Sequence, residues 1–365
     1  KNIGAFGGNK DNVTVFGQSV GGVSVDLLHV SPHSTNLFHK VVPMAGNAEA
    51  EWVFRKGMVK ACERRAKKMG IQEWNDSEEL MCKLRELPAT AFAADFFNKD
   101  SDDDLEVCPV LGTEFLPASI RELRARATPK PAMSGVAQYE ALQLVLRSEL
   151  TIEGIRAIVD KILPLDVNSA EKAAFIKRYI DLDAENSEED IARAASKIHS
   201  DSFLNAPTLK LAHANLAAHP DQPMYLYAFH HFNPDGFWPP ERYAFIAATH
   251  CTELCYLFGK GFTRPFEFDD NDRKVTELFT RAFTNFAKYG DPNGAGNDDL
   301  PVHWGRVNGD HPERNYIFDI EPREAQEFFE VQNFLDLWKA NIISIEGYRP
   351  FKGIRKPKKS AFHMK

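Results

Sequence analysis

Short apolar runs alternate with amphipathic, helix-like stretches along most of this 365-residue chain. The runs are rich in β-branched, aromatic or small residues and are bounded by turn formers, which predicts buried strands of a mostly parallel sheet. The predicted strands cover residues 13–16, 39–46, 130–139, 223–232 and 315–320. Because helical patterns separate them, the sequence indicates an α/β fold.

The segment from 151 to 218 departs from this alternation, because its whole pattern is helical. Ser187 and Asp190 form a capping pair that predicts the start of one of its helices. A helical block of this length inside an α/β chain predicts an insertion or lid within the sheet topology. We therefore expect one domain over 1–365 that contains a helical insertion at 151–218.

Other helices are predicted from apolar faces and from their end signals. Gly290 is expected to close a long amphipathic helix, and Asp76 with Glu79 predicts a capping box at the start of another. A loop with a short strand is expected within 104–117. The remaining helices are predicted near residues 20–31, 51–69, 117–127 and 324–342.

One strand-to-helix junction carries candidate chemistry, in the stretch DNVTVFGQSVGGVSV at residues 11–25. Its segment GQSVG matches G-x-S-x-G, the turn that exposes a nucleophilic serine, here Ser19, above a sheet. We expect glycines such as Gly17 and Gly21 because side chains there would collide with the neighbouring strand or helix. Ser19 would also lie at a helix N-terminus, where free N–H groups favour developing negative charge.

A serine hydroxyl is a weak nucleophile without a base, which is usually a histidine that a carboxylate orients. The chain has 12 histidines. His230 and His231 end a predicted strand and His250 opens a helix-like run, and the local pattern does not choose among them. Each histidine, taken alone, is more often a surface or hydrogen-bonded core residue than a base.

Composition and charge exclude several classes of function. At 43% hydrophobic and 26% charged residues the chain is typical of globular proteins, and its net charge of −8 argues against nucleic acid as a partner. No stretch approaches the ~20 apolar residues of a membrane span, and the basic segment 348–365 is expected to be a solvated tail. Five cysteines do not make a disulfide scaffold. The spacing of His250, Cys251, Glu253 and Cys255 does not match a zinc site, so we expect neither a metal nor a cofactor.

Three ordered blocks, NVTVFGQSVGG, SGVAQYEAL and ATHCTELCYLFG, closely resemble the active-site blocks of the type-B carboxylesterases, the cholinesterase-like branch of the α/β-hydrolases. Three further segments resemble the same family: DSFLNAP at 201–207, MYLYAF at 224–229 and FTNFAKYGDPN at 283–293. The resemblance covers nearly the whole chain. It implies an α/β-hydrolase fold, with a mostly parallel sheet flanked by helices.

The resemblance also implies roles for individual residues. Ser19 would be the nucleophile, Glu140 the acid that orients the base, and His250 the general base and acid. The backbone N–H of Val20 would donate to the oxyanion. The expected reaction is hydrolysis of a small-molecule carboxylic ester through an acyl-enzyme.

This sequence departs from the family's pattern at a few positions. Gln18 and Val20 stand where the family usually has glutamate and alanine around the serine, and the larger Val20 side chain lies beside the oxyanion site. Ile71 stands where the family often has a cysteine paired with one at the Cys82 position, which puts that disulfide in doubt. Ser24 and Asp201 match buried polar support positions.

The family's upstream His-Gly-Gly-Gly loop, which completes the oxyanion hole, has no counterpart in this sequence. We therefore expect an N-terminal part that carries this loop and the first strands of the sheet to be missing. The strand at 13–16 would then form an exposed apolar edge, and the chain would be poorly soluble or inactive by itself. The alternatives to an active esterase are a non-catalytic esterase-like binding or adhesion module and an inactive, truncated pseudo-enzyme.

Overall fold

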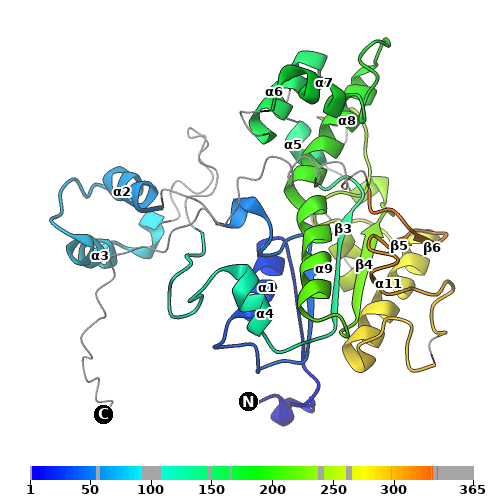
Figure 1. The fold of residues 1–365 in the computed structure, drawn as a ribbon, viewed down its shortest axis with the longest axis horizontal. Helices are drawn as coiled ribbons and strands as arrows, with labels where there is room; N and C mark the ends of the chain where they lie inside the picture. Colours follow the sequence, from blue (N-terminus) through cyan, green and yellow to red (C-terminus); the bar gives the residue numbers. More distant parts are fainter. Residues whose placement is uncertain are drawn as a thin grey trace. The chain divides into compact units, whose positions relative to one another are not determined.

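The computed structural model describes residues 2–54, 58–92, 108–146, 149–163, 167–236, 242–259, 265–296 and 298–329, together with positions 331 and 335. The chain divides into two compact units (Figure 1). One unit comprises Lys1–Ala50 and Leu111–Lys365, and the other comprises Glu51–Val110. The three residues of the proposed catalytic triad all belong to the first unit.

A six-stranded sheet forms the centre of the first unit, with its strands in sequence order. The first five strands are parallel to their neighbours, and only the last pair is antiparallel. The strands are β1 (Thr14–Gln18), β2 (Lys40–Met44), β3 (Ala132–Ala137), β4 (Met224–Phe229), β5 (Asn315–Phe318) and β6 (Arg323–Ala325). The mostly parallel sheet and the five predicted strands are confirmed, whereas β6 was not predicted.

Helices cover both faces of this sheet (Figure 1). One layer contains α1 (Val20–Val30), α4 (Ile120–Arg126) and α9 (Ala206–Ala218). The other layer contains α10 (Glu253–Phe258) and α11 (Asp270–Tyr289). A short helix, η5 (Pro234–Gly236), precedes both of them in the sequence. The predicted fold class, a mostly parallel sheet flanked by helices, is therefore confirmed.

Strand β4 packs against helices on both faces of the sheet. Its six residues are all buried, and its side chains alternate between the two faces. Tyr225, Tyr227 and Phe229 pack with Phe279 of α11 and with Trp304 in one aromatic cluster. A strand buried on both faces reads as a continuous apolar run, which is how this segment appears in the sequence.

β1 is the end strand of the sheet, and no described strand pairs with its outer edge. Its burial is only partial, and Phe16 is 47% exposed. The Phe16 ring stacks on Phe258, with 6.3 Å between the ring centroids. The expected fully buried strand at this position is therefore wrong for this chain, whereas the expected exposed apolar edge is present.

The segment 151–218 forms α6 (Ile152–Ile162), α7 (Ser169–Ile176), α8 (Glu188–Ser200), a π-helical turn η4 (Asp201–Asn205) and α9. Ser187 and Asp190 make the reciprocal hydrogen bonds of a capping box at the start of α8. Asp201 lies in the π-helical turn with 2% exposure, and it accepts hydrogen bonds from Tyr179 and Asn205. The role of this segment as an insertion or lid stays a prediction.

A buried ion cluster joins the layer that contains α1, α4 and α9. The Arg124 guanidinium donates to both oxygens of Asp26 at 2.9 Å and to Glu49 at 3.0 Å. Arg124 also donates to the side-chain oxygen of Asn215, and the Ala48 N–H donates to the Asp26 carboxylate. Burial alone would raise the pKa of Asp26, but the charge of Arg124 holds it below its ordinary value.

The second unit contains η2 (Glu51–Val53), α2 (Met58–Lys68), α3 (Ser77–Glu86) and η3 (Ala89–Phe92). Asp76 caps α3 by accepting from the N–H groups of Glu78 and Glu79, as predicted. The predicted capping box is incomplete, because the Glu79 carboxylate accepts from the N–H of Asn75 instead. Cys82 has a free thiol.

Two predicted elements differ from the structure. The described part of 104–117, from 108 onward, has turns and no strand. The helix predicted over 324–342 does not begin at 324, because Arg323–Ala325 is β6, which pairs with β5. Its later positions and the basic segment 348–365 lie almost wholly outside the described residues.

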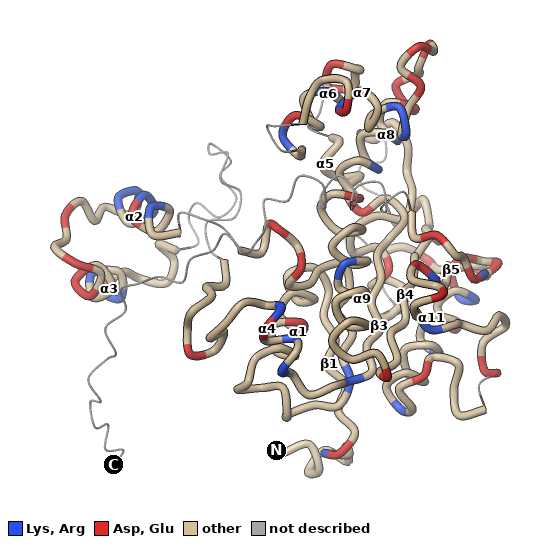
Figure 2. The backbone as a smooth tube through the Cα atoms, in the orientation of Figure 1, with Lys and Arg blue, Asp and Glu red and all other residues tan. Residues whose placement is uncertain are grey.

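Other surface features add little to the fold. Acidic and basic residues are interspersed along the backbone in Figure 2. Within the described ranges, no helix has the length and apolar character needed to span a bilayer. The remaining short elements are η1 (Ile3–Phe6) and α5 (Leu142–Val145).

Candidate active site

Ser19 occupies a strained turn between β1 and α1. Its backbone angles are φ 61° and ψ −123°, a combination that L-residues rarely adopt and that costs about 1–3 kcal/mol. The Ser19 N–H donates to the carbonyl of Met44 at 2.9 Å, which fixes the turn against β2. This is the geometry that holds a serine hydroxyl clear of the sheet.

The glycines around Ser19 differ in whether the fold leaves room for a side chain at their positions. A Cβ at Gly17 would lie 2.6 Å from the carbonyl oxygen of Gly21, and one at Gly22 would lie 2.5 Å from that of Gly46. A Cβ at Gly21 would meet nothing within 4 Å, so the expected collision is wrong at that position. Ser24 is exposed and donates to the Val20 carbonyl, so its expected burial is also wrong.

Glu140 follows β3 and is 2% exposed. Its Oε1 accepts a hydrogen bond of 2.6 Å from the N–H of Ala137. The next residue, Ala141, donates its N–H to Ser200 Oγ at 3.0 Å, and the Thr249 hydroxyl donates to the Glu140 carbonyl at 3.4 Å. The Ala137 N–H therefore holds the carboxylate, while Ser200 and Thr249 hold the backbone around it.

His250 lies between the serine and the acid. Its Nδ1 is 2.7 Å from Glu140 Oε2, and its Nε2 is 2.8 Å from Ser19 Oγ. With Nδ1–H donating to the carboxylate, Nε2 is free to accept the serine proton. Burial lowers the pKa of His250, but the Glu140 carboxylate and Cys251 together raise it by more, so the net shift is upward.

The structure thus brings together the three side chains that the sequence placed far apart, whereas the other two candidates, His230 and His231, have different surroundings. His231 Nε2 lies 2.8 Å from Asp272 Oδ1. Burial lowers the pKa of His230 to about 4, which keeps that ring neutral. Among the described residues, no group of three or more His, Cys, Asp or Glu side chains is arranged to hold a metal ion.

Two side chains beside His250 were not assigned a role from the sequence. Gln18 Nε2 lies 3.3 Å from Nδ1 and 3.5 Å from Nε2 of the ring, so the amide contacts the ring near both nitrogens. The Cys251 thiol donates to Gln18 Oε1 at 3.1 Å, from a residue with φ 71°. Their positions next to Ser19 and His250 in the sequence were the available signal.

Val20, whose backbone N–H is the predicted oxyanion donor, is the first residue of α1. An N–H at this position has no acceptor within its own helix, and the helix dipole adds partial positive charge. The Val20 side chain is 59% exposed, so it points away from the packed interior.

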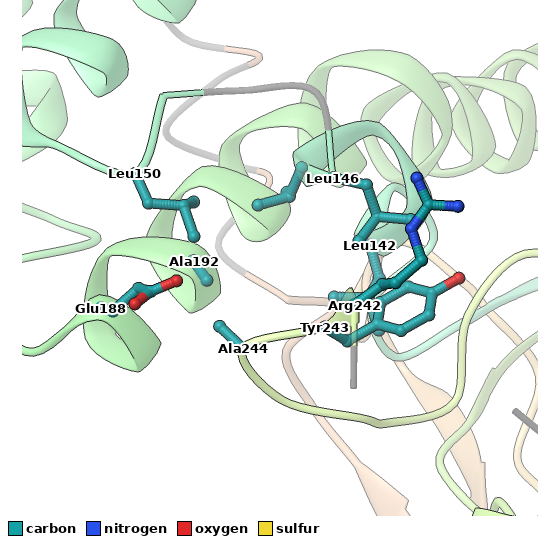
Figure 3. Close-up of a pocket in the computed structure, with 9 residues that line it drawn as sticks. Leu142, Leu146, Leu150, Glu188, Ala192, Arg242, Tyr243 and Ala244 are labelled. Atoms are coloured by element: carbon teal, nitrogen blue, oxygen red, sulfur yellow. The ribbon is translucent and has the colours of Figure 1, made fainter. Parts of the chain in front are cut away.

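A pocket of about 220 Å³ lies beside the segment that carries Glu140 (Figure 3). It is lined by Leu142, Val145, Leu146, Leu150, Glu188, Ala192, Arg242, Tyr243 and Ala244. Its lining combines leucine, valine and alanine side chains with the charged side chains of Glu188 and Arg242 and with Tyr243. Phe245, which follows the lining segment, packs edge-on against Tyr139 at 4.9 Å, so both walls of the pocket connect to residues near the triad.

Comparisons with known proteins show what this chain is similar to. The chain is 34% identical over 339 residues to Esterase cest-33 of Caenorhabditis elegans, across 90% of this chain and 60% of that protein. It is 26% identical over 319 residues to Bile salt-activated lipase of Rattus norvegicus, across 83% and 51%. It is also 28% identical over 318 residues to Neuroligin-2 of Homo sapiens, across 80% and 36%.

The chain therefore spans about 60% or less of the length of these three relatives. The model of the carboxylesterase family matches residues 1–338, which is nearly all of the sequence. This match agrees with the mostly parallel sheet flanked by helices and with the turn at Ser19. The chain belongs to the carboxylesterase family.

Proposed function

We propose that this chain carries the machinery of a serine carboxylic ester hydrolase, with Ser19 as nucleophile, His250 as general base and acid, and Glu140 as the orienting acid. The observation that supports it is the continuous path of short contacts, 2.8 Å from Ser19 Oγ to His250 Nε2 and 2.7 Å from His250 Nδ1 to Glu140. Family membership supports the same reaction class.

In the proposed reaction, His250 Nε2 takes the proton of Ser19 as Oγ attacks the acyl carbonyl carbon. Glu140 stabilises the imidazolium that forms, and His250 then gives the proton to the departing alkoxide. The products of this half-reaction are an alcohol and an acyl-serine. Water, activated by the same imidazole, then hydrolyses the acyl group and restores the Ser19 hydroxyl.

The N–H of Val20 would donate to the carbonyl oxygen as negative charge develops on it. Esterases of this architecture use a second donor from another loop, and this sequence has no His-Gly-Gly-Gly run. Loss of one such donor costs about 10²–10³ in turnover. We therefore expect the proposed turnover to depend on the Val20 donor to about this extent.

The pocket beside Glu140, which is lined by both apolar and polar side chains, is the proposed place for part of the ester. Its volume of about 220 Å³ and its lining by Leu142, Leu146 and Leu150 suit a short aliphatic or aromatic group. Ala244 is exposed at its margin, so a larger side chain there would narrow the pocket without disturbing the core. The proposed substrates are small-molecule esters with an apolar group.

The alternative hypothesis is an esterase-like protein that does not hydrolyse esters. The similarity to Neuroligin-2, whose name states no hydrolase activity, is compatible with this reading. The two readings differ in the reactivity of one hydroxyl, so labelling with a fluorophosphonate separates them. We expect label on the wild-type chain and none on Ser19→Ala; label at another serine, or none at all, would contradict the proposal.

A further inference from the structure

One contact joins the residue before Ser19 to the residue after His250, and the proposed reaction does not use either side chain. Gln18 is the last residue of β1, and Cys251 follows His250 directly. The Cys251 thiol donates to Gln18 Oε1 at 3.1 Å, across 233 positions of the sequence. The fold therefore links the immediate neighbours of the nucleophile and of the base to each other.

The Gln18 amide lies against the face of the His250 ring. Its Nε2 is 3.3 Å from Nδ1 and 3.5 Å from Nε2 of the imidazole. An atom nearly equidistant from both nitrogens at this range cannot lie in the ring plane, because the ring carbon between the nitrogens would block it. In that plane the two nitrogens already have Glu140 and Ser19 as partners. An N–H group on an aromatic face makes a weak attraction, and the ring cannot tilt toward Gln18 without pushing into the amide.

The thiol of Cys251 determines which end of the amide faces the ring. The oxygen and the NH₂ group of a glutamine amide have nearly the same shape, so packing alone does not choose between them. Because the thiol donates to Oε1, the NH₂ group of Gln18 is the end against His250. An oxygen in that place would favour the protonated imidazolium, which cannot act as a base.

The backbone at Cys251 is strained in a way that its side chain must offset. Its φ of 71° lies in the left-handed region, which glycine adopts freely and a residue with a Cβ does not. Strain of this kind collects at functional sites, where the surrounding structure holds it in place. Ser19, the proposed nucleophile, has a positive φ as well.

We propose that Cys251 and Gln18 form a positioning pair for His250. The thiol orients the amide, and the amide keeps the imidazole in line with its two partners, Ser19 and Glu140. Neither side chain of the pair takes up a proton in the reaction. The inference rests on the proposed function, because its consequence is the reactivity of Ser19. Cys251 also acts on the ring itself, where it raises the pKa together with Glu140, so the experiment separates this direct effect from the one through Gln18.

The rate of fluorophosphonate labelling at Ser19 measures the effect of the pair, as a maximal rate and a half-saturating concentration of the reagent. Cys251→Ser keeps a hydrogen-bond donor and should label within about 2-fold of wild type. Cys251→Ala should lower the maximal rate about 3–10-fold, the size expected for one neutral hydrogen bond, and leave the half-saturating concentration unchanged. Equal maximal rates for Cys251→Ala and wild type would overturn the proposal.

Two control variants separate positioning from a loss of stability. Cys251→Gly also lacks the thiol but suits φ 71°, so it should melt about 2 °C above Cys251→Ala and yet label equally slowly. Cys255→Ala removes a buried thiol from α10 and should label like wild type even where it melts lower. Labelling that follows the melting temperature, or that slows as much in Cys255→Ala as in Cys251→Ala, would show a merely structural role.

A double-mutant cycle tests whether the thiol acts through the amide. Gln18→Ala should slow labelling at least as much as Cys251→Ala, and combining the two should slow it by less than about 2-fold further. The full effect of Cys251→Ala in the Gln18→Ala background would show that the thiol acts on His250 directly, against the proposal. If wild type itself is not labelled at Ser19, the proposed hydrolase fails and the positioning pair with it; a labelled wild type with unaffected variants overturns the pair alone.

Discussion

Replacing Ser19 with glycine should leave the protein more stable than replacing it with alanine. Both substitutions remove the hydroxyl and its contact with His250, so that loss cancels in the comparison. They differ in the backbone, because Ser19 has φ 61° and ψ −123°. Glycine adopts this region freely, whereas alanine keeps the Cβ that makes it unfavourable.

The size of the difference follows from two opposing effects. Relief of the backbone strain is worth about 1–3 kcal/mol, and the greater freedom of glycine in the unfolded chain costs about 0.4–1 kcal/mol. The net advantage of glycine at Ser19 is therefore about 1 kcal/mol, which corresponds to a melting temperature about 2 °C higher for a chain of this size.

Thermal unfolding followed by differential scanning fluorimetry measures this difference directly, with urea unfolding as a second measurement. Ser24 is the matched control, since it is an exposed serine inside α1. There the order must reverse, because glycine within a helix is about 1 kcal/mol less favourable than alanine. Ser19→Ala melting at or above Ser19→Gly would refute the strained turn.

Four further outcomes are expected. Glu140→Gln should slow fluorophosphonate labelling by about 10⁴-fold, as measured by stopped labelling and mass spectrometry, because the amide favours the wrong imidazole tautomer; a loss under 10-fold would contradict the role of the acid. Labelling by wild type should be half-maximal above pH 6.5, because Glu140 raises the pKa of His250 and only the neutral ring is a base; a midpoint at or below 6.5 argues against it. Arg124→Met should lower the free energy of unfolding in urea by about 3–5 kcal/mol, because it leaves Asp26 buried without its partner; a loss under 1 kcal/mol would show that the cluster is not needed. Ala244→Phe should shift the preference among p-nitrophenyl esters toward shorter acyl chains without changing labelling by a small fluorophosphonate; an unchanged preference would remove the pocket from the proposal.

The turn at Ser19 could be predicted because its signals are local. The apolar run of β1, the glycines and the apolar face of α1 are contiguous in the sequence, and each satisfies a backbone requirement of a strand-turn-helix unit. Glu140 and His250 are different, because their local patterns resemble those of ordinary surface and core residues. Only the resemblance of whole blocks selected them, and only coordinates could place them within hydrogen-bonding distance.

The missed features depend on tertiary contacts. Gln18 and Cys251 lie in distant parts of the sequence, so their contact could not be predicted, although each stands next to a predicted site residue. Similarly, the helical pattern around Glu324 was misleading because that carboxylate accepts the N–H of Gly305 at 2.8 Å while Arg323–Ala325 pairs with β5. Strand pairing with a distant segment outweighed the local helical preference.

The central claim is that one hydroxyl is made reactive by an imidazole brought to it from a distant part of the chain. The most direct measurement is mass spectrometry of the peptide spanning residues 11–25 after fluorophosphonate treatment of wild type and His250→Gln. The account predicts one phosphonyl group on Ser19 in wild type and its near-complete loss in the variant. Equal modification of both proteins, or modification confined to another serine, would contradict it.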